Sequence, residues 1–230
     1  MTALQAIIFD FDGVIADSEP LHLRAFQRTL AEIGLELSAA DYFNQYLGFD
    51  DVGVFEALGQ HSGTPFSGDQ VRDLVARKGI HLHELTSAGD ALFPGARDFI
   101  RAAAARVPVA IASGALRNEI DEVLAASGLA SLFPVIVASG DTPHSKPSPA
   151  PYDLAFRQLQ QATGLPLDRC RCVAIEDSRW GLDSARGAGL RCVGVTNSYP
   201  AHELPGAELI AGGLAELTLD ALDRLCANRP

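Results

Sequence analysis

The chain has 230 residues, of which 47% are hydrophobic, and a formal net charge of −11 at pH 7. This length and composition predict an ordinary globular protein of one large domain or two small ones, and they exclude a disordered chain. The acidic balance argues against non-specific nucleic-acid binding, because the phosphate backbone attracts basic surfaces.

The N-terminal segment contains a short apolar run, Ala6–Phe9, which is followed directly by Asp10 and two residues later by Asp12. A continuous apolar run of this length predicts a strand buried on both faces of a parallel sheet, and ligands bind at the carboxyl ends of such strands. Two carboxylates at this position repel one another unless one is protonated or a hard cation such as Mg²⁺ binds them. We therefore expect chemistry at Asp10 and Asp12; the alternative interpretation is two solvated aspartates in a turn.

A helical insert is expected over residues 16–88, directly after the first strand. Asp17 or Ser18 can cap its first helix, Pro20 fits the first turn, and Gly34 suits the stop. Further segments with helical apolar spacing are residues 39–47, 52–58 and 70–85. No convincing strand pattern interrupts them, so the insert is predicted to be all-helical.

Strand and helix patterns alternate from residue 89 onward. The expected strands are residues 107–112, 134–138, 172–175, 190–195 and 207–210. The expected helices are residues 96–105, 116–126, 149–163, 178–188 and 214–227. This alternation predicts an α/β fold, with a Rossmann-like parallel sheet core that carries helices on both faces. The predicted domains are a core of residues 1–15 and 89–230 and an inserted all-helical cap of residues 16–88.

Two further strand ends carry groups that bind anions. Ser113 and Gly114 follow the strand expected at 107–112, where a hydroxyl and a glycine N–H at a helix start can cradle an anion. Helix capping by Ser113 is the alternative. Lys146 follows the strand expected at 134–138, just before a helix, and both the cation and the helix N-terminus attract phosphate. The alternative is a solvated loop lysine.

The strand expected at 172–175 ends in a second acidic pair, Glu176 and Asp177, which again leads into a helix. Capping by Asp177 would explain one acid but not two. A Mg²⁺ site built from Asp10, Asp177 and Glu176 explains both acidic pairs together. The strand ends thus offer a carboxylate nucleophile, an acid/base, a metal site, a hydroxyl and a lysine, which are the groups that phosphoryl transfer requires.

These motifs occur in order along the chain as Asp10-Phe11-Asp12-Gly13-Val14, Ser113, Lys146 and Glu176-Asp177. The ordered set resembles the four motifs of the haloacid dehalogenase (HAD) superfamily, and the helical insert after the first motif resembles the C1 cap of its subfamily I. Residues 15–22 further resemble the β-phosphoglucomutase-like and sugar-phosphatase group. The resemblance covers nearly the whole chain, and the ordered set with the cap is highly specific, although any one motif is weak.

The resemblance implies a Mg²⁺-dependent enzyme in which Asp10 is the nucleophile that forms an aspartyl-phosphate and Asp12 is the general acid/base. It also implies phosphate binding by Ser113 and Lys146, with Lys146 restraining Asp10 as well. The metal ligands that it implies are Asp10, the backbone carbonyl of Asp12, Glu176 and Asp177. The true dehalogenases of the superfamily lack the second aspartate, so Asp12 disfavours a C–halogen hydrolase.

The cap is expected to supply substrate specificity, with His22, Arg24 and Lys78 as candidate substrate contacts. Lys78 resembles a cap lysine of β-phosphoglucomutase, whereas a surface helix face is the alternative for His22 and Arg24. Asp50 and Asp51 stand where that mutase has basic residues, and a mutase must grip two phosphates. We therefore predict a phosphatase for a small phosphorylated metabolite, with a sugar phosphate as the first choice. The alternatives are a β-phosphoglucomutase-type phosphomutase and a non-catalytic module that binds a phospholigand.

The chain has no C-x-x-C pair, and its four cysteines are Cys170, Cys172, Cys192 and Cys226. We interpret them as buried small apolar residues of a protein in the reducing cytoplasm, with Cys170 and Cys172 on one strand face. Asp10 and Asp12 interrupt the early apolar run, so no secretory signal is predicted, and no apolar span approaches the roughly 20 residues of a membrane helix. The expected partner is a small phosphorylated substrate, without nucleic acid or membrane, and a monomer is expected rather than an oligomer.

Overall fold

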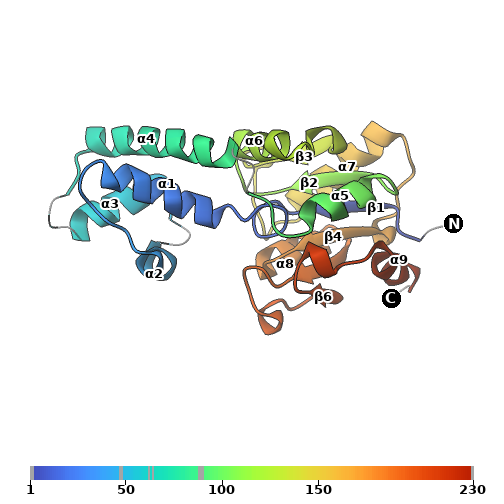
Figure 1. Ribbon diagram of the computed structural model, residues 1–230. Helices are drawn as coiled ribbons and strands as arrows, with labels where there is room; N and C mark the ends of the chain where they lie inside the picture. The colour runs from blue at the N-terminus through green and yellow to red at the C-terminus, as the bar shows by residue number, and fades with distance from the viewer. Residues whose placement is uncertain (1–2, 47–48, 62, 64, 88–90, 229–230) are drawn as a thin grey trace. The chain divides into compact units, whose positions relative to one another are not determined.

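The computed structural model describes residues 3–46, 49–61, 63, 65–87 and 91–228 (Figure 1). The chain forms two compact units, one of residues 1–17 with 91–230 and one of residues 18–90, which we call the core unit and the cap unit. The boundaries expected from the sequence, 15/16 and 88/89, each lie two residues before the observed ones.

A parallel sheet lies at the centre of the core unit (Figure 1). In spatial order its strands are β3 (Val135–Val137), β2 (Val109–Ala112), β1 (Ala6–Phe9), β4 (Cys172–Glu176), β5 (Arg191–Val195) and β6 (Leu209–Ala211). Every adjacent pair is parallel. The first strand in sequence, β1, lies between β2 and β4. The predicted α/β class with a Rossmann-like parallel sheet is confirmed. Its central strands are fully buried, as apolar strands covered on both faces must be.

Helices cover both faces of this sheet. In the described part of the core unit they are α5 (Ala96–Ala104), α6 (Arg117–Ser127), α7 (Ala150–Thr163), α8 (Arg179–Gly187) and α9 (Leu219–Ala227). Successive side chains of β1 point to opposite faces. Ile8 belongs to the apolar cluster that also holds Tyr152 of α7 and Leu182 of α8. Phe9 instead meets Phe99 of α5 edge-on, with ring centroids 6.2 Å apart, so different helices bury the two faces.

The helix expected at 214–227 is interrupted. A 3₁₀ turn at Leu214–Glu216 is followed by the extended residue Leu217 before α9 begins. The break has a local cause, because the Thr218 hydroxyl accepts a hydrogen bond from the N–H of Ala221 at 3.2 Å and so caps a new helix start.

The expectation that Cys170 and Cys172 share one strand face was wrong. Cys170 lies in a 3₁₀ turn, Arg169–Arg171, and is exposed, whereas Cys172 begins β4 and is buried. The Asp168 carboxylate accepts a hydrogen bond from the N–H of Cys170 at 3.1 Å, which stabilises the turn. The strand therefore begins only at Cys172. Cys192 and Cys226 are buried, as expected.

The described residues of the cap unit form helices joined by turns and loops, with no strand among them. Its α-helices are α1 (Glu19–Ala31), α2 (Ala39–Asp41), α3 (Asp51–His61) and α4 (Gly68–Ser87). The segment expected as a helix at 39–47 forms only the short α2 and a π-helical turn at Tyr42–Tyr46, and residue 47 lies outside the described part. An apolar cluster that includes Phe26, Phe55 and Leu74 joins α1, α3 and α4.

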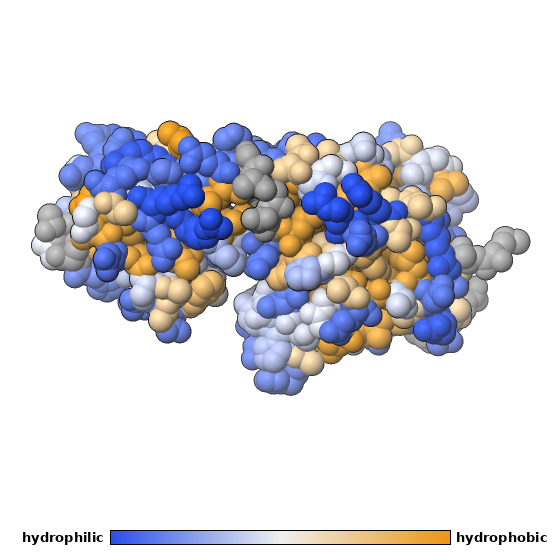
Figure 2. Space-filling model, viewed as in Figure 1, coloured by the Kyte–Doolittle hydropathy of each residue, from blue (hydrophilic) through white to orange (hydrophobic). Residues whose placement is uncertain are grey.

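The viewed surface over α4 is mostly hydrophilic (Figure 2). The buried residues of this helix are Val71, Leu74, Lys78, Leu85 and Thr86, and the first four follow helical spacing along one stripe. A lysine in this apolar stripe needs an internal partner. Within the described residues, no helix combines the length and the apolar character that crossing a bilayer requires.

Candidate active site

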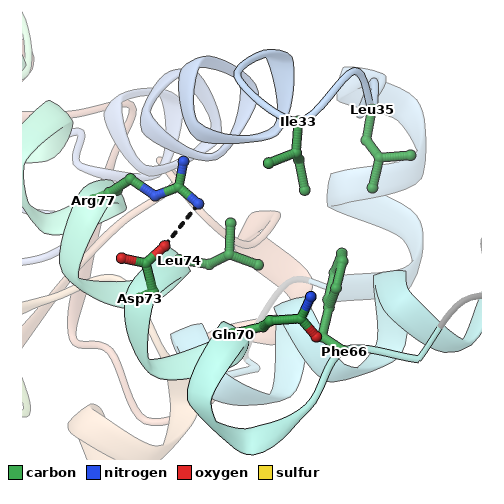
Figure 3. A pocket seen from close by; sticks show the side chains of 7 residues that line it. All are labelled: Ile33, Leu35, Phe66, Gln70, Asp73, Leu74 and Arg77. Atoms are coloured by element: carbon green, nitrogen blue, oxygen red, sulfur yellow. Dashed lines mark ion pairs between the residues drawn. The ribbon is translucent and has the colours of Figure 1, made fainter.

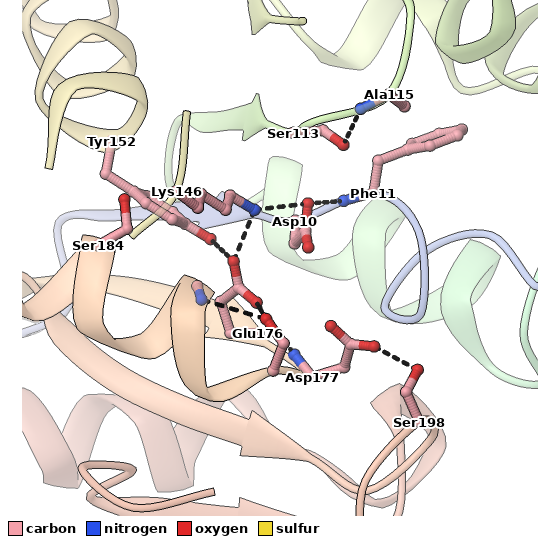
Figure 4. A network of polar contacts seen from close by, with 12 residues as sticks. Asp10, Phe11, Ser113, Ala115, Lys146, Tyr152, Glu176, Asp177, Ser184 and Ser198 are labelled. Atoms are coloured by element: carbon pink, nitrogen blue, oxygen red, sulfur yellow. Dashed lines mark hydrogen bonds and ion pairs between the residues drawn. The ribbon is translucent and has the colours of Figure 1, made fainter. Parts of the chain in front are cut away.

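The order of the sheet determines where the site forms. After β1 the chain adds β2 and β3 on one side and then crosses over to add β4 on the other side of β1. Ligands bind at such a switch point, beyond the carboxyl ends of the strands. Asp10 directly follows β1, and its N–H donates to the carbonyl of Ile175 in β4 at 2.9 Å. Asp10 therefore lies where β1 and β4 end together, and a network of polar side chains surrounds it (Figure 4).

Lys146 connects two carboxylates of this network. Its Nζ lies 2.8 Å from Asp10 Oδ1 and 2.6 Å from Glu176 Oε1. Glu176 has no exposed side-chain surface, and the side chain of Lys146 is 13% exposed. Burial alone would lower the pKa of Lys146, but the charges of Asp10 and Glu176 outweigh burial and raise it. The lysine thus stays cationic beside the candidate nucleophile.

Three buried acids share this end of the sheet. One oxygen each of Asp10, Glu176 and Asp177 can be chosen so that all three atoms lie within 4.8 Å of one another. Burial, followed by the charge of Asp10, raises the pKa of Asp177 to about 7, although the hydrogen bond from Ser198 lowers it. Burial and Asp10 raise the pKa of Glu176 as well, against the opposing effect of Lys146. One lysine does not neutralise three carboxylates, so the donor set fits a hard cation such as Mg²⁺.

Two glycines permit this close packing of acids. Gly13 has φ +73°, and a Cβ on it would lie 1.9 Å from Asp177 Oδ2. A Cβ on Gly181, in the first turns of α8, would lie 1.9 Å from the carboxylate atoms of Glu176. Real Cβ atoms never approach so closely, so any larger residue at either position displaces an acid of the cluster.

Ser113 lies at the end of β2, next to β1. Its N–H donates to the carbonyl of Val137 at 2.9 Å, and its hydroxyl oxygen accepts from the N–H of Ala115 at 3.1 Å (Figure 4). Ser113 is 4% exposed, while Gly114 is exposed. Asp12 is also exposed, in the turn after β1, where its backbone forms a bridge with Ala16. The structure therefore brings Asp10, Lys146, Glu176 and Asp177 together and places Ser113, Gly114 and Asp12 at adjacent loops.

Several polar contacts of the site were not predicted. The Tyr152 hydroxyl donates to Glu176 Oε1 at 2.8 Å, the Ser198 hydroxyl donates to Asp177, and the Asn197 amide donates to the carbonyl of Gly13 at 2.7 Å. Asn197 and Ser198 follow the end of β5, so the rule that identified the other strand ends could have found them. Tyr152 lies within α7, and no sequence pattern distinguishes it from an ordinary core tyrosine.

The predicted cap residues do not form one group. Lys78 Nζ lies 2.8 and 3.0 Å from the two oxygens of Asp51 and 2.9 Å from Nδ1 of His22. Burial, and then the charge of Lys78, lowers the pKa of His22 to about 4, so the imidazole is neutral and its Nδ1 accepts a hydrogen bond from the lysine ammonium. Arg24 is exposed and lies two residues after His22 on α1, so it faces away from this cluster. Asp50, the other predicted acid, caps the N–H of Gly53 at 2.8 Å.

A hollow of about 340 Å³ also lies within the cap unit (Figure 3). It is lined by Ile33, Leu35, Phe66, Gln70, Asp73, Leu74 and Arg77. Its two charged residues, Asp73 and Arg77, pair with each other at 2.9 Å. The hollow holds no cluster of nucleophile, acid and cation such as the sheet end provides, so the chemistry is assigned to the core unit.

An α/β core with a helical unit inserted after its first strand, and with acids and a lysine at the ends of the central strands, defines a class of hydrolases. The chain belongs to that class as a member of the haloacid dehalogenase-like hydrolase family, whose family model matches residues 4–189. It is therefore an enzyme of the HAD hydrolase type, as the motifs predicted.

Named relatives cover most of the chain. It is 36% identical to protein CbbY of Rhodobacter capsulatus over 206 residues, which is 85% of this chain and 87% of the relative. It is 29% identical to hexitol phosphatase B of Escherichia coli strain K12 over 224 residues, which is 97% of this chain and 95% of the relative. A crystal structure of mutant CbbY from Rhodobacter sphaeroides with xylulose-(1,5)bisphosphate matches with a TM-score of 0.73 and 30% identity, over 96% of this chain and 99% of that one.

Proposed function

We propose that this enzyme is a Mg²⁺-dependent phosphatase that hydrolyses a small sugar phosphate through an aspartyl-phosphate on Asp10. The observation that carries the proposal is the geometry around Asp10: a lysine at 2.8 Å and two further buried acids at the end of the central strands. The sugar-phosphate class is supported by the relatives, one of which is a hexitol phosphatase while another was crystallised with a sugar bisphosphate.

The proposed reaction has two displacement steps at phosphorus. In the first, a carboxylate oxygen of Asp10 attacks phosphorus, the bond to the sugar oxygen breaks, and Asp12 gives its proton to that leaving oxygen. In the second, Asp12 takes a proton from water, whose oxygen attacks phosphorus and releases phosphate from Asp10. Lys146, with the Ser113 hydroxyl and the Gly114 N–H, holds the phosphoryl oxygens. Mg²⁺ held by Asp10, Glu176, Asp177 and the Asp12 carbonyl would supply further charge neutralisation.

Charge in the cap unit favours a phosphatase over a phosphomutase. A mutase binds one phosphate on the substrate and a second one in transfer, which calls for free cationic groups in the cap. Asp51 neutralises Lys78, and His22 beside them is uncharged. In this proposal His22 and Lys78 contact the uncharged hydroxyls of the sugar. Arg24, on another face of α1, has no role in it.

The proposal also includes a cellular compartment and an oligomeric state. All four cysteines are free thiols, and three of them are buried, which favours a reducing cytoplasm. We expect a monomer, which sedimentation equilibrium with and without Mg²⁺ would test.

The deciding experiment is phosphate release with Mg²⁺ across sugar phosphates, hexitol phosphates, sugar bisphosphates, nucleotides and phosphoglycolate, for the wild type and Asp10→Asn. We expect turnover of at least one sugar phosphate that disappears in the variant and in excess chelator. Turnover that persists in Asp10→Asn would remove Asp10 as nucleophile. Interconversion of hexose 1- and 6-phosphates with little free phosphate would establish the phosphomutase instead. Tight phosphate binding without any turnover would establish a binding module.

A further inference from the structure

Tyr152 is a buried polar residue of the core unit that the proposed reaction does not use. It lies in α7 with no exposed surface, within the apolar cluster on one face of the sheet. Its hydroxyl lies at the edge of this cluster and donates a hydrogen bond to Glu176 Oε1 at 2.8 Å (Figure 4). Burial, followed by the charge of Glu176, raises the pKa of Tyr152 well above its ordinary value, so the hydroxyl keeps its proton and acts as a donor.

The Glu176 carboxylate receives donors on both oxygens. Oε1 accepts from Lys146 Nζ at 2.6 Å and from the Tyr152 hydroxyl at 2.8 Å. Oε2 accepts from the Ser178 hydroxyl at 3.2 Å and from the N–H of Asp177 at 3.3 Å. Donors therefore hold both oxygens of the carboxylate, so the group cannot rotate without losing a hydrogen bond.

The contact between Tyr152 and Glu176 also affects Lys146. Lys146 bridges Glu176 and Asp10, and the two carboxylates compete for the same ammonium group. The Tyr152 hydroxyl, as a second donor on Glu176 Oε1, weakens the attraction of this oxygen for Lys146 and so favours the pair of Lys146 with Asp10. The lysine nitrogen also lies 5.2 Å from the centre of the Tyr152 ring, so the residue holds Lys146 from two directions.

We propose that Tyr152 is a positioning residue: its hydroxyl fixes the rotation of the Glu176 carboxylate. The fixed carboxylate in turn keeps Lys146 paired with Asp10 and keeps the acid cluster in the arrangement that would bind the cation. The inference rests on the proposed function, because Lys146 and the acid cluster are its phosphate-binding and Mg²⁺-binding groups. Outer hydrogen-bond partners of metal-binding carboxylates act in this way, and their loss costs roughly 10- to 100-fold in metal affinity or activity.

The test compares Tyr152→Phe with Tyr42→Phe. Both changes remove a hydroxyl that donates to a glutamate at 2.8 Å, but Tyr42 lies in the cap unit and donates to Glu19. Phenylalanine keeps the ring at each position, so the packing is preserved. Isothermal titration measures the dissociation constants of Mg²⁺ alone and of inorganic phosphate with Mg²⁺. Thermal unfolding in chelator measures the stability of the metal-free variants, and steady-state kinetics gives kcat and KM.

We expect Tyr152→Phe to weaken Mg²⁺ binding and to lower kcat, each by about 10-fold, while Tyr42→Phe matches the wild type in both. Wild-type Mg²⁺ and phosphate affinities in a folded Tyr152→Phe would overturn the inference, even if its thermal stability fell. A wild type that binds no Mg²⁺ would overturn it as well. Absence of wild-type turnover would count against the proposed function alone, because the binding measurements do not depend on catalysis.

Discussion

Lys146 Nζ forms an ion pair with Asp10 Oδ1 at 2.8 Å, although the two residues come from separate loops at the end of the sheet. The lysine is the one cation that contacts the acid cluster among the described residues, and its second partner, Glu176, is fully buried. Among the described residues, the acids of the metal-free site are therefore paired with one positive charge, that of Lys146.

We predict that Lys146→Met destabilises the metal-free protein by about 3 kcal/mol, because a buried carboxylate that loses its partner is left uncompensated. Urea unfolding in chelator measures the change, and Mg²⁺ should recover part of it by replacing the missing charge. Turnover should fall by about 100-fold or more, since the phosphoryl oxygens lose a contact. Arg117→Met is the control, because its pair with Asp121 is exposed on α6; an equal loss of stability in the control would contradict the assignment.

The stability of the metal-free protein should depend on pH through Asp177. The pKa of this carboxyl rises from 3.8 to about 7 on folding, so the folded state binds more protons than the unfolded state between these values. The free energy of unfolding must then fall as pH rises from about 4 to 7. Thermal unfolding in chelator across this range checks the slope, which Asp177→Asn should reduce and saturating Mg²⁺ should reverse. A flat profile in the wild type would rule out a strongly raised pKa.

Gly13→Ala should disrupt the acid cluster. The new Cβ would lie 1.9 Å from Asp177 Oδ2 on a backbone with φ +73°. We expect a loss of about 3 kcal/mol in stability and at least 10-fold in kcat/KM, since strain and overpacking add. Gly34→Ala is a matched control, because Gly34 has φ +74° with open space around it. It should lose only about 1 kcal/mol and no activity; similar kcat/KM values for the two variants would show that the displacement of Asp177 is harmless.

The charge balance of the cap unit rests on Asp51. Asp51→Asn leaves the buried ammonium of Lys78 beside a neutral histidine, which should cost about 2 kcal/mol; the loss is moderated because the Asp51 side chain is 32% exposed. Urea unfolding measures the loss, and adding Lys78→Met should restore most of it. If the cap contacts the substrate, freeing Lys78 should also raise the turnover of a sugar bisphosphate relative to a monophosphate. Unchanged relative rates would place this cluster outside the substrate contacts.

The architecture could be predicted from the sequence alone. Short apolar runs that alternate with helical patterns favour a parallel sheet covered on both faces, so periodicity predicted the strands and the helical insert. Acids placed directly after strands, as at Asp10 and at Glu176 with Asp177, identified the chemistry because parallel strands end at one edge. The same local patterns misplaced Cys170, since the turn capped by Asp168 depends on one side-chain hydrogen bond.

Only the tertiary structure shows which hydrogen-bond and ion-pair partners the buried polar side chains have. Sequence distance does not tell which lone pair a buried donor will reach, so the hydrogen bond from Tyr152 to Glu176 and the pairing of Lys78 with Asp51 were not visible in the chain. Periodicity marks a residue as buried or exposed, whereas charge compensation depends on distances of about 3 Å between atoms on different elements. The fold class and the reactive strand ends are therefore properties of the sequence pattern, and the balance of charge at Asp10, Lys146 and Asp177 is a property of the packed molecule.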